Sequence, residues 1–415
     1  MTVNRRGILL GTVAAALFGR AAPALAAQEI VIGAVYPTSG PNAQIGVDAR
    51  HALETAVDIV NAVHDIDLPT AKSEGIAGLG GARIRLVFAD HQGDPQKGRA
   101  EAERLITQDK VVAVIGAFHS SVSSTVSVTC ERYGVPYMCA DSSSPSLHRR
   151  NLKFFFRPSA HDELFSLAMF DFLDAQRAAG MKVETVALFH EDTIFGTDSS
   201  NVQRKLAGDR GYDIAVDIKY RANSPSLTSE VQQLKSADAD VLMPSSYTTD
   251  AILLVRTMGE LGYKPKNILA QAAGFSEKAV FDAAGEKLDG LISRASFSLD
   301  LAAKRPSIAY VNERFKARAG RDLNDNTSRQ FMALLILADA LDRAKSVEGE
   351  KVRAALAGTN IPAERTIMPW SNCAFGPDGQ NTGADPVLIQ YLGGKWVTVF
   401  PEAVAVAGAK WPMAS

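Results

Sequence analysis

Apolar residues along this chain follow two alternating patterns. Continuous apolar runs, such as EIVIGAV at 29–35, are typical of buried strands, and segments with apolar residues at helical spacing follow them. In the first 157 residues these patterns predict strands at 29–35, 83–89, 111–116 and 135–140 and helices at 48–63, 96–108 and 120–133. The strand at 83–89 alternates like an edge strand. Repeated strand–helix units build a mostly parallel sheet with helices on both faces.

The same alternation begins again after residue 157, which predicts a second, similar lobe. It gives strands at 185–190, 213–220, 241–244 and 268–271 and helices at 196–210, 227–236 and 250–261. A strand at 291–296, helices at 307–319 and 329–344, and a closing hairpin of strands 387–392 and 396–400 complete the pattern. Residues 402–415 carry no clear signal and are treated as a tail. The predicted fold class is α/β, with two similar lobes of parallel-sheet βα units.

Polar loops follow the predicted strands. They span residues 36–41, 117–121, 141–145, 191–196 and 245–249, and they are rich in hydroxyl groups and aromatic rings but contain few cations. In open parallel sheets, ligands bind in crevices outside the carboxyl ends of the strands. We therefore expect these loops to clasp a small molecule between the two lobes.

The first 26 residues have the layout of a secretory signal peptide. Asn4-Arg5-Arg6 gives a positive start, an apolar run covers residues 7–18, and Ala24-Leu25-Ala26 places small residues where a signal peptidase reads. The apolar run is shorter than the ~20 residues that a membrane-spanning helix needs. The arginine pair fits a twin-arginine export signal, with an ordinary signal as the alternative. We expect a periplasmic protein with 1–26 as its signal peptide.

Composition favours a globular protein of two domains. Removing 26 of 415 residues leaves 389, which is long for one core and suits two domains of ordinary size. Hydrophobic residues make up 46% and charged residues 22% of the chain, and the formal net charge is −2. Since charges of both signs are dispersed, neither nucleic acid nor an anionic membrane surface is expected as the main partner.

The sequence carries no motif for catalysis, a cofactor or a metal ion. The first strand leads into YPTSGP instead of Gly-x-Gly-x-x-Gly, and no Gly-x-Ser-x-Gly occurs. No Cys-x-x-Cys or His-x-x-x-His spacing suggests a metal site. Cys130 and Cys139 could pair as a disulfide, or these two and Cys373 could all be buried as small hydrophobic residues. We expect a binding protein and not an enzyme.

The loops and strands together resemble a known family. The segments IGAVYPTSGPNAQIG, FADHQGDPQKGRAEAERLI, VVAVIGAFHSS, GVPYMCADSSSPSL, FFFRPSAHDE and VALFHEDTIFG, with FGPDGQN and VLIQYLGGKW near the end, resemble the leucine/isoleucine/valine-binding proteins. These are periplasmic receptors of the branched-chain amino acid ABC transporter class. The resemblance covers nearly all of the mature chain. It implies a type I periplasmic binding fold, and a monomer that delivers its ligand to the membrane permease of an ABC importer.

The resemblance also implies domain boundaries. Three crossovers would fall near 157–160, 291–297 and 369–375. The first lobe would then comprise 27–157 with 295–368, the second lobe 158–294 with 369–401, and the tail 402–415. Ligand binding would shift an open–closed equilibrium by rotation about the crossovers.

Two serine-rich loops of the first lobe are the candidate polar site. The resemblance implies that Ser120, with Ser121 beside it, holds the ligand carboxylate. A helix N-terminus offers unpaired N–H groups to an anion, although a serine there can instead cap its own helix. In the second loop, the resemblance implies that the backbone carbonyl of Asp141 and the hydroxyl of Ser143 hold the ligand's amine and carboxylate. The side chain of Asp141 would face the cleft or cap Ser143 and Ser144.

Aromatic and apolar side chains would form the walls of the cleft. The resemblance places Phe195 and Tyr247 of the second lobe against the ligand, and Ile45 and Phe331 of the first lobe in its side-chain pocket. Aromatic rings supply a large contact area at little entropic cost, although either ring could pack within its own lobe. His119 either faces the pocket or is structural.

One position departs from the family. The amino-acid binders carry an acid in the loop after strand 268–271 that pairs with the ligand's ammonium, and Ala273 stands there in this chain. Burying an ammonium without a counter-charge is costly. Either the ligand has no α-amine or another acid supplies the charge, from Asp162, Asp141, Glu191 or Asp192. Asp162 also fits the N-terminal acid of the helix that follows it. We expect import of an amino acid or related small carboxylate, with an exported ligand-sensing receptor as the alternative.

Overall fold

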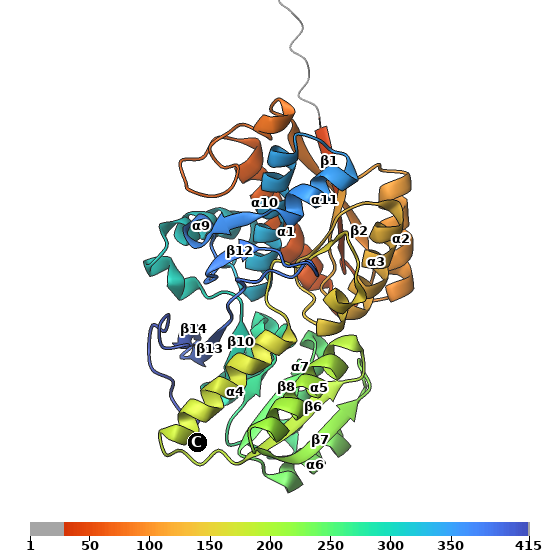
Figure 1. Cartoon of the computed structure of the whole chain (residues 1–415). Coiled ribbons are helices and arrows are strands. Elements are labelled where there is room, and N and C mark those ends of the chain that lie inside the picture. Colours follow the sequence, from red (N-terminus) through yellow and green to blue (C-terminus); the bar gives the residue numbers. More distant parts are fainter. Residues whose placement is uncertain (1–28, 414–415) are drawn as a thin grey trace, which may run out of the picture.

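The computed structural model describes residues 29–413, which form two lobes stacked one above the other (Figure 1). Each lobe contains a sheet covered by helices, which confirms the predicted α/β class. The predicted signal peptide lies outside the described residues. Within 29–413, no helix is both long enough and apolar enough to cross a membrane.

The first lobe is built on a five-stranded parallel sheet. Its strands are β1 (Glu29–Tyr36), β2 (Arg83–Asp90), β3 (Ala113–Gly116), β4 (Tyr137–Cys139) and β5 (Phe155–Phe156), in the order β2-β1-β3-β4-β5. The alternating strand β2 lies at the edge, as predicted. Helices α1 (Ala43–Asn61), α9 (Pro306–Ala319) and α10 (Asp325–Ala344) cover one face, and α2 (Pro95–Thr107) and α3 (Ser120–Tyr133) cover the other.

The second lobe holds two sheets that join edge to edge. Strands β6 (Thr185–Glu191), β7 (Asp213–Tyr220) and β8 (Val241–Ser245) are parallel, in the order β7-β6-β8. Strands β9 (Leu269–Ala270), β10 (Ile292–Ala295), β13 (Val387–Leu392) and β14 (Lys395–Phe400) follow in the order β9-β10-β13-β14. A bridge between Leu242 and Ile268 links the two sheets. The helices are α4 (Asp162–Ala178), α5 (Ile194–Asp209), α6 (Thr228–Ala237), α7 (Thr248–Glu260) and α8 (Lys278–Ala284).

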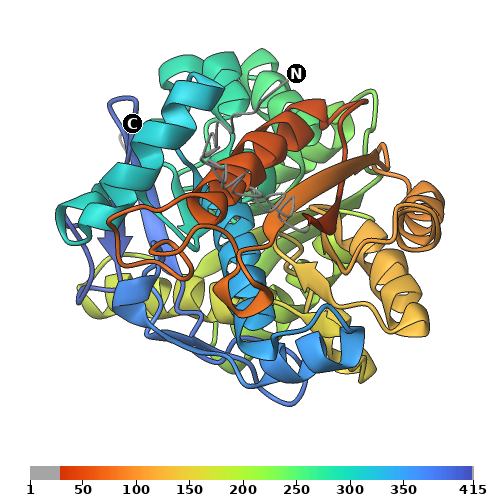
Figure 2. The same cartoon turned by 90° about the horizontal axis from the view of Figure 1, so that it is seen from above.

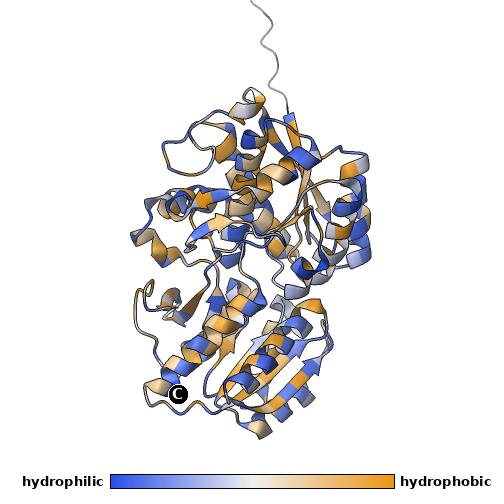
Figure 3. Cartoon of the chain, viewed as in Figure 1, coloured by the Kyte–Doolittle hydropathy of each residue, from blue (hydrophilic) through white to orange (hydrophobic). Residues whose placement is uncertain are grey.

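Short elements that the sequence pattern does not predict complete both lobes. They include β5 and α8, and also α11 (Gly349–Ala357), the paired strands β11 (Asn360–Pro362) and β12 (Asn372–Ala374), and the 3-10 turns η1 (Ala77–Leu79), η2 (Pro145–Arg150), η3 (Ala273–Ser276), η4 (Gly285–Leu288), η5 (Leu299–Ala303) and η6 (Ala363–Arg365). Hydrophobic residues concentrate in the strands, whereas the outer helices carry both hydrophobic and hydrophilic residues (Figure 3).

Local sequence explains where key helices begin. The side chain of Asp94 accepts hydrogen bonds from Gln96 N and Lys97 N, and Pro95 follows it at the first helical position of α2. At α10, Asn324 and Thr327 form a reciprocal capping box. The long helix α10 is buried along most of its length and packs beside α1, as the view from above shows (Figure 2). Its N-terminus is thereby fixed at the junction of the lobes.

Two of the three crossovers between the lobes lie side by side. Arg157 N donates to Gly379 O at 2.8 Å, and Asn381 N donates back to Arg157 O at 3.0 Å. The amide side chain of Asn381 also donates to the carbonyl of Pro158 at 2.8 Å. The first and third crossovers therefore form one hydrogen-bonded pair at the hinge.

The other crossings define where each lobe ends. The second follows β10, and Ser296 N donates to Asp325 at the start of α10 at 2.6 Å. Because β12 pairs with β11, and Trp370 and Cys373 pack in the core of the first lobe, the third crossing runs between β12 and β13. This is later than the expected 369–375, since β12 belongs with the first lobe.

The C-terminal segment is not a loose tail. Met413 N donates to Asn267 Oδ1 at 2.9 Å, and the ring of Trp411 packs edge-on against Phe172 with centroids 5.3 Å apart. The described part of the predicted tail at 402–415 thus packs against the second lobe. The sequence pattern does not predict this packing, because the contacts are made by isolated side chains and not by a helix or strand with a periodic apolar face.

The three cysteines, Cys130, Cys139 and Cys373, are free and buried. Burial raises the pKa of each thiol. Of the two interpretations from the sequence, the structure supports small buried side chains, and Cys130 and Cys139 are not joined.

Candidate functional site

Loops from the carboxyl ends of the strands of both lobes meet at one place. The buried cluster of the first lobe, which includes Ile45, Phe118 and Phe331, continues without interruption into Phe195, Tyr247 and Ala273 of the second lobe. The strand-end loops therefore face one another, as predicted, and the lobes are in contact there.

The loop after β3 aims the N-terminus of α3 at this contact. A Cβ on Gly116 would lie 2.4 Å from the carbonyl oxygen of Val35, so only glycine allows β3 to approach β1 this closely. Phe118 has a φ of +66°, which turns the chain into the helix. His119 is the N-cap residue, and its side chain makes no capping hydrogen bond. Ser120 follows in the first turn.

Ser120 is 1% exposed, and its Oγ has no hydrogen-bond partner within residues 29–413. The serine does not cap its own helix, so the alternative interpretation of its role lacks support. A buried hydroxyl without a partner costs free energy, and beside a helix N-terminus it suits an anionic group. Ser121, one position on, lines a small cavity between the lobes.

Asp141 is engaged by the first lobe itself. Its carboxylate accepts hydrogen bonds from Tyr36 Oη at 2.8 Å and Gln330 Nε2 at 3.0 Å. Its backbone carbonyl accepts from Arg329 Nη1 at 2.7 Å. Burial raises the pKa of the carboxyl to about 6, against the lowering effect of Arg329. The side chain therefore caps neither Ser143 nor Ser144, in contrast to one of the two expectations.

Ser143 lies where the first lobe meets α4. It is 3% exposed, its carbonyl accepts from Asp162 N at 2.8 Å, and its Oγ lies 3.5 Å from Arg294 Nη2 of β10. The hydroxyl predicted to bind ligand is thus paired, at the limit of hydrogen-bond distance, with a guanidinium of the other lobe.

Asp162 is fully buried at the start of α4. Its carboxylate accepts from Ser199 Oγ and from Gln271 Nε2, both at 2.9 Å, and lies 4.0 Å from Arg294. It is the first residue of α4, and His161 occupies the N-cap position. The carboxylate is thus held by neighbouring side chains of the second lobe rather than left open.

An aromatic group joins the two lobes. The ring centroid of Tyr247 lies 5.3 Å from Phe118, 4.8 Å from His119 and 5.2 Å from Phe195. Burial lowers the pKa of His119 to about 3, so its imidazole is neutral. His119 Nε2 pairs with Asn42 Nδ2 at 3.1 Å. Tyr247 therefore faces the first lobe, and Phe195 packs beside it in the same buried cluster.

The loop after β9 brings no charge to the contact at Ala273. Ala272 and Ala273 both have positive φ, at +46° and +50°, and a Cβ on Gly274 would lie 2.7 Å from the backbone of Tyr247. The next acid in this loop, Glu277, accepts from Asn326 Nδ2 of α10 at 2.7 Å, and burial raises its pKa to about 7.

The other two acids proposed as a counter-charge are used locally. Glu191 accepts from the hydroxyl of Thr193 at 2.7 Å and from Gly196 N at 2.7 Å, so it organises the start of α5. Asp192 accepts from Ala222 N at 3.0 Å.

Arg294, Arg329 and Gln330 are polar residues of the contact that the sequence patterns do not identify. Arg294 interrupts an apolar strand, which is a signal in itself, because a charged residue inside a buried run needs a partner. Arg329 and Gln330 lie on α10, where helical periodicity hides them among buried apolar positions.

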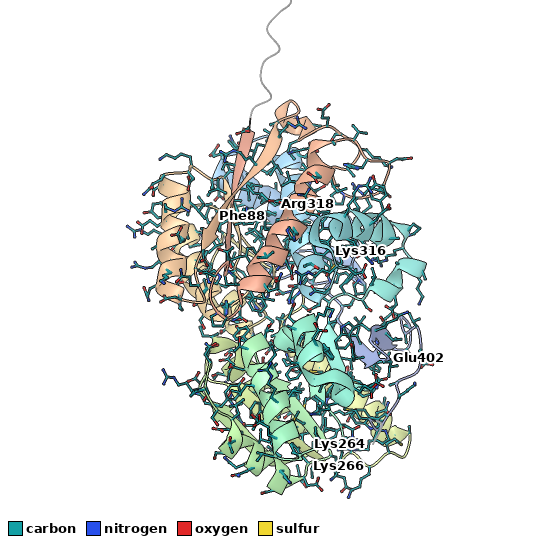
Figure 4. The ribbon with its side chains drawn as sticks, turned by 180° about the vertical axis from the view of Figure 1, so that it is seen from behind. Phe88, Lys264, Lys266, Lys316, Arg318 and Glu402 are labelled. Carbon is teal, nitrogen blue, oxygen red and sulfur yellow. The ribbon has the colours of Figure 1, made fainter. Side chains whose placement is uncertain are left out.

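Among residues 29–413, one cavity lies between the lobes and a larger one lies within the second lobe. One of about 100 Å³ is lined by both lobes, with Asn42, His119 and Ser121 on one side and Thr193 and Tyr247 on the other. The other, of about 1100 Å³, belongs to the second lobe alone, between α7, α8 and the β13–β14 turn. Lys264 on its rim projects at the end of the second lobe that is remote from the first (Figure 4). Only the smaller cavity adjoins the predicted site.

A histidine cluster at the hinge has the composition of a metal site but not its electrostatics. Ligand atoms of His148, His161 and Glu163 lie within 4.8 Å of one another. Arg157 pairs with His148 Nδ1, and Arg149 pairs with Glu163. Burial and Arg157 lower the pKa of His148 to about 4 and of His161 to about 2. A cation there would face two guanidinium groups, so the cluster does not suit a metal ion.

Comparison with known proteins places the chain in a family. The periplasmic binding protein family matches residues 29–389. A Leu/Ile/Val-binding protein homolog 7 from Brucella suis biovar 1 (strain 1330) is 28% identical, over 97% of this chain and 99% of that protein.

Solved structures share the fold. The branched-chain amino acid transporter substrate binding protein LivJ from Streptococcus pneumoniae, in complex with isoleucine, is 18% identical with a TM-score of 0.74, and covers 90% of this chain and 100% of its own. A solute binding protein of an ABC transporter from Rhodopseudomonas palustris BisB5, in complex with 3,4-dihydroxy benzoic acid, is 15% identical with a TM-score of 0.72, and covers 89% of this chain and 95% of its own.

Proposed function

Because this chain belongs to the periplasmic binding protein family, we propose that it clasps a small carboxylate between its lobes and delivers it to an ABC importer. The family consists of binding proteins rather than enzymes, and it implies a periplasmic location. The ligand, the importer and the export route are our proposals.

One observation carries the proposal. The hydroxyl of Ser120, in the first turn of α3, is buried without a partner within residues 29–413, and Phe118 and His119 just before it pack against Tyr247 of the second lobe. A helix N-terminus supplies N–H donors and a positive dipole end to an anion. A carboxylate at this point would satisfy Ser120 and be covered by aromatic rings of both lobes.

The hinge supports a clamp mechanism. Arg157 and Asn381 bind the first and third crossovers to each other, so the two segments can bend together. Closing brings the α3 loop against the loops after β6, β8 and β9. Ligand that bridges these loops binds the closed arrangement better and shifts the equilibrium toward it.

The fold alone leaves the ligand class open. Of the two structural neighbours above, one holds an amino acid and the other an aromatic acid. Small carboxylates with and without an α-ammonium group are therefore both candidates for this chain.

A thermal-shift screen of amino acids, 2-oxo acids, aromatic acids and dicarboxylates, with amides as neutral controls, tests the proposal. A ligand at roughly 100 times its Kd should stabilise the folded state by about 2.7 kcal/mol and raise the Tm. The double variant Ser120→Ala/Ser143→Ala should lose that shift while it retains the Tm of the unliganded protein within a few degrees. If no small carboxylate raises the Tm, the ligand class is wrong. If the double variant binds as tightly as the wild type, the assigned site is wrong.

Delivery is tested by uptake. Deleting the gene should abolish uptake of the identified radiolabelled ligand, and a copy of the wild-type gene should restore it. Unchanged uptake with loss of a transcriptional response to the ligand would instead indicate a sensing receptor.

A further inference from the structure

A buried arginine of the second lobe lies at the centre of the contact between the lobes. Arg294 comes from β10, is 2% exposed, and lies over the ring of Phe165 with its guanidinium carbon 3.8 Å from the centroid. Burial lowers its pKa to about 10, and it remains charged at neutral pH. Removing a charge from water is costly unless close partners compensate it.

The partners of Arg294 are distant. Nη1 lies 3.4 Å from Asp325, Nη2 lies 3.5 Å from Ser143 and 4.0 Å from Asp162, and Nε has no partner within residues 29–413. Strong charge-assisted hydrogen bonds are about 2.7–2.9 Å long. Within residues 29–413, the closest of these contacts is 3.4 Å long, so Arg294 makes no hydrogen bond of that length.

Another fully buried arginine shows what a satisfied guanidinium looks like in this chain. Arg157 donates to Gln380 Oε1 at 2.6 Å, to Ser144 O at 2.9 Å and to Ser142 O at 3.2 Å. Arg294 is equally buried but lacks such acceptors. The two arginines contact different parts of one loop, because the carbonyls of Ser142 and Ser144 point to Arg157 whereas the hydroxyl of Ser143 lies toward Arg294.

The acids near Arg294 are already bonded to other donors. Asp325 accepts from Ser296 N at 2.6 Å and from Arg329 Nη2 at 2.8 Å. Asp162 accepts from Ser199 Oγ and Gln271 Nε2, both at 2.9 Å. Both carboxylates are therefore held by donors that lie closer than Arg294, and the guanidinium is left without a close acceptor among residues 29–413.

An ammonium group has no comparable place. The carboxylate and carbonyl of Asp141 are both engaged, the carbonyl by the positively charged Arg329 at 2.7 Å. Ala273 brings no charge from the facing loop, and it is only 6% exposed. Gln330 Oε1 has no hydrogen-bond partner within residues 29–413, but it is a neutral acceptor. A ligand ammonium would thus find each nearby carboxylate already hydrogen-bonded and would lie close to the guanidinium groups of Arg294 and Arg329.

We propose that Arg294 binds an anionic group of the ligand, and that the protein prefers carboxylates without an α-ammonium group, such as 2-oxo acids, over the corresponding amino acids. This inference rests on the proposed function of the cleft as a carboxylate site. In the proposed cleft, Ser120 is one polar contact for the ligand, and Arg294 and Ser143 form a second polar contact on the hinge side. A planar guanidinium matches a carboxylate in a bidentate manner.

Matched ligand pairs test the preference by isothermal titration calorimetry. The pairs are 4-methyl-2-oxopentanoate with L-leucine, and phenylpyruvate with L-phenylalanine, which differ at the carbon that carries oxygen or ammonium. The wild type should bind the oxo acid of at least one pair 10-fold or more tighter than the amino acid. Arg294→Gln should weaken oxo-acid binding roughly 10- to 100-fold, which is about 1.4 to 2.7 kcal/mol.

Two further variants separate recognition from stability. Arg294→Lys keeps the charge and should retain a preference for the oxo acid, with intermediate affinity. Arg305→Gln removes a half-buried arginine that is bonded within the first lobe to Ala363 O at 3.0 Å and Thr366 Oγ1 at 3.2 Å, and it should leave the preference unchanged. If Arg294→Gln does not fold, two measurements still test the role of Arg294. They are the oxo-acid affinity of Arg294→Lys and the wild-type ratio of oxo-acid affinity to amino-acid affinity.

The outcomes distinguish this inference from the proposed function. An amino acid that binds as tightly as its oxo acid, or wild-type affinity in Arg294→Gln, would overturn the role of Arg294 and leave the carboxylate cleft standing. If neither pair binds and the thermal-shift screen also finds no carboxylate, the proposed function itself fails. If another carboxylate binds with unchanged affinity in Arg294→Gln, the inference alone fails.

Discussion

Replacing Tyr247 by alanine should open the lobes. Its ring is 6% exposed and packs against Phe118 and His119 of the first lobe, with centroids 5.3 and 4.8 Å away. Aromatic pairs contribute about 0.5–1.5 kcal/mol each beyond the burial of area. Losing both pairs across the lobes should therefore cost the closed form about 1–3 kcal/mol, and lower the ratio of closed to open molecules roughly 5- to 150-fold.

Fluorescence resonance energy transfer between the lobes measures that ratio. Lys316 on α9 and Lys205 on α5 have side chains that are 57% and 74% exposed, and Figure 4 shows Lys316 on the surface of the first lobe. Both can be replaced by cysteine and labelled. The native thiols are buried with raised pKa values, so they should stay unmodified. Tyr247→Ala should move molecules from the high-transfer to the low-transfer population.

A matched control separates opening from loss of stability. Tyr212 is 4% exposed and packs edge-on against Phe170 at 5.5 Å, entirely within the second lobe. Tyr212→Ala should lower the Tm but leave the distribution of energy transfer unchanged. If Tyr247→Ala has the wild-type distribution, or if both variants shift it equally, the aromatic contact does not hold the lobes together.

Three further predictions follow from single features. Burial raises the pKa of Glu277 from 4.5 to about 7, so the folded form favours the protonated acid; the contribution is complete below about pH 4.5 and is lost as the pH rises through 7. Between pH 5 and 8 the Tm of the wild type should fall relative to that of Glu277→Gln, because the buried histidines titrate alike in both proteins and only Glu277 differs; parallel curves would contradict this. Gly274→Ala should weaken ligand binding at least 10-fold in calorimetry, because its Cβ would lie 2.7 Å from the backbone of Tyr247; unchanged affinity would show that the loop yields. Replacing Arg5 and Arg6 by lysine should block export in a fractionation assay if the signal is of the twin-arginine type, and continued export would indicate an ordinary signal.

The fold is largely predictable because strand and helix periodicity are local properties. Helix α3 and strands β7 and β13 have the predicted bounds, and the other main elements begin or end within a few residues of them. Helix α1 begins at Ala43, five residues before the expected 48, because the turn at 40–42 leads directly into it. The short β12 was not predictable, since three residues carry no period and its pairing with β11 is a tertiary contact.

The position of the candidate loops at the contact between the lobes is predictable from the sequence, but the hydrogen-bond partners of their side chains are not. The strand-end rule and the resemblance bring Ser120, Ser143 and Tyr247 to one contact between the lobes. What the sequence could not provide is the partner of each group, because these partners are far away along the chain. Asp141 bonds Tyr36, 105 positions earlier, and Arg294 approaches Ser143, 151 positions earlier. The charge in the buried strand 291–296 was the one visible sign of Arg294.

The most direct test of the clamp is to add ligand to the labelled protein. The carboxylate with the largest thermal shift should convert molecules to the high-transfer state with a midpoint equal to its calorimetric Kd. The Ser120→Ala/Ser143→Ala variant should need at least 10-fold more ligand for the same conversion. A carboxylate that binds in calorimetry without changing the distribution of energy transfer would contradict closure of the two lobes around it.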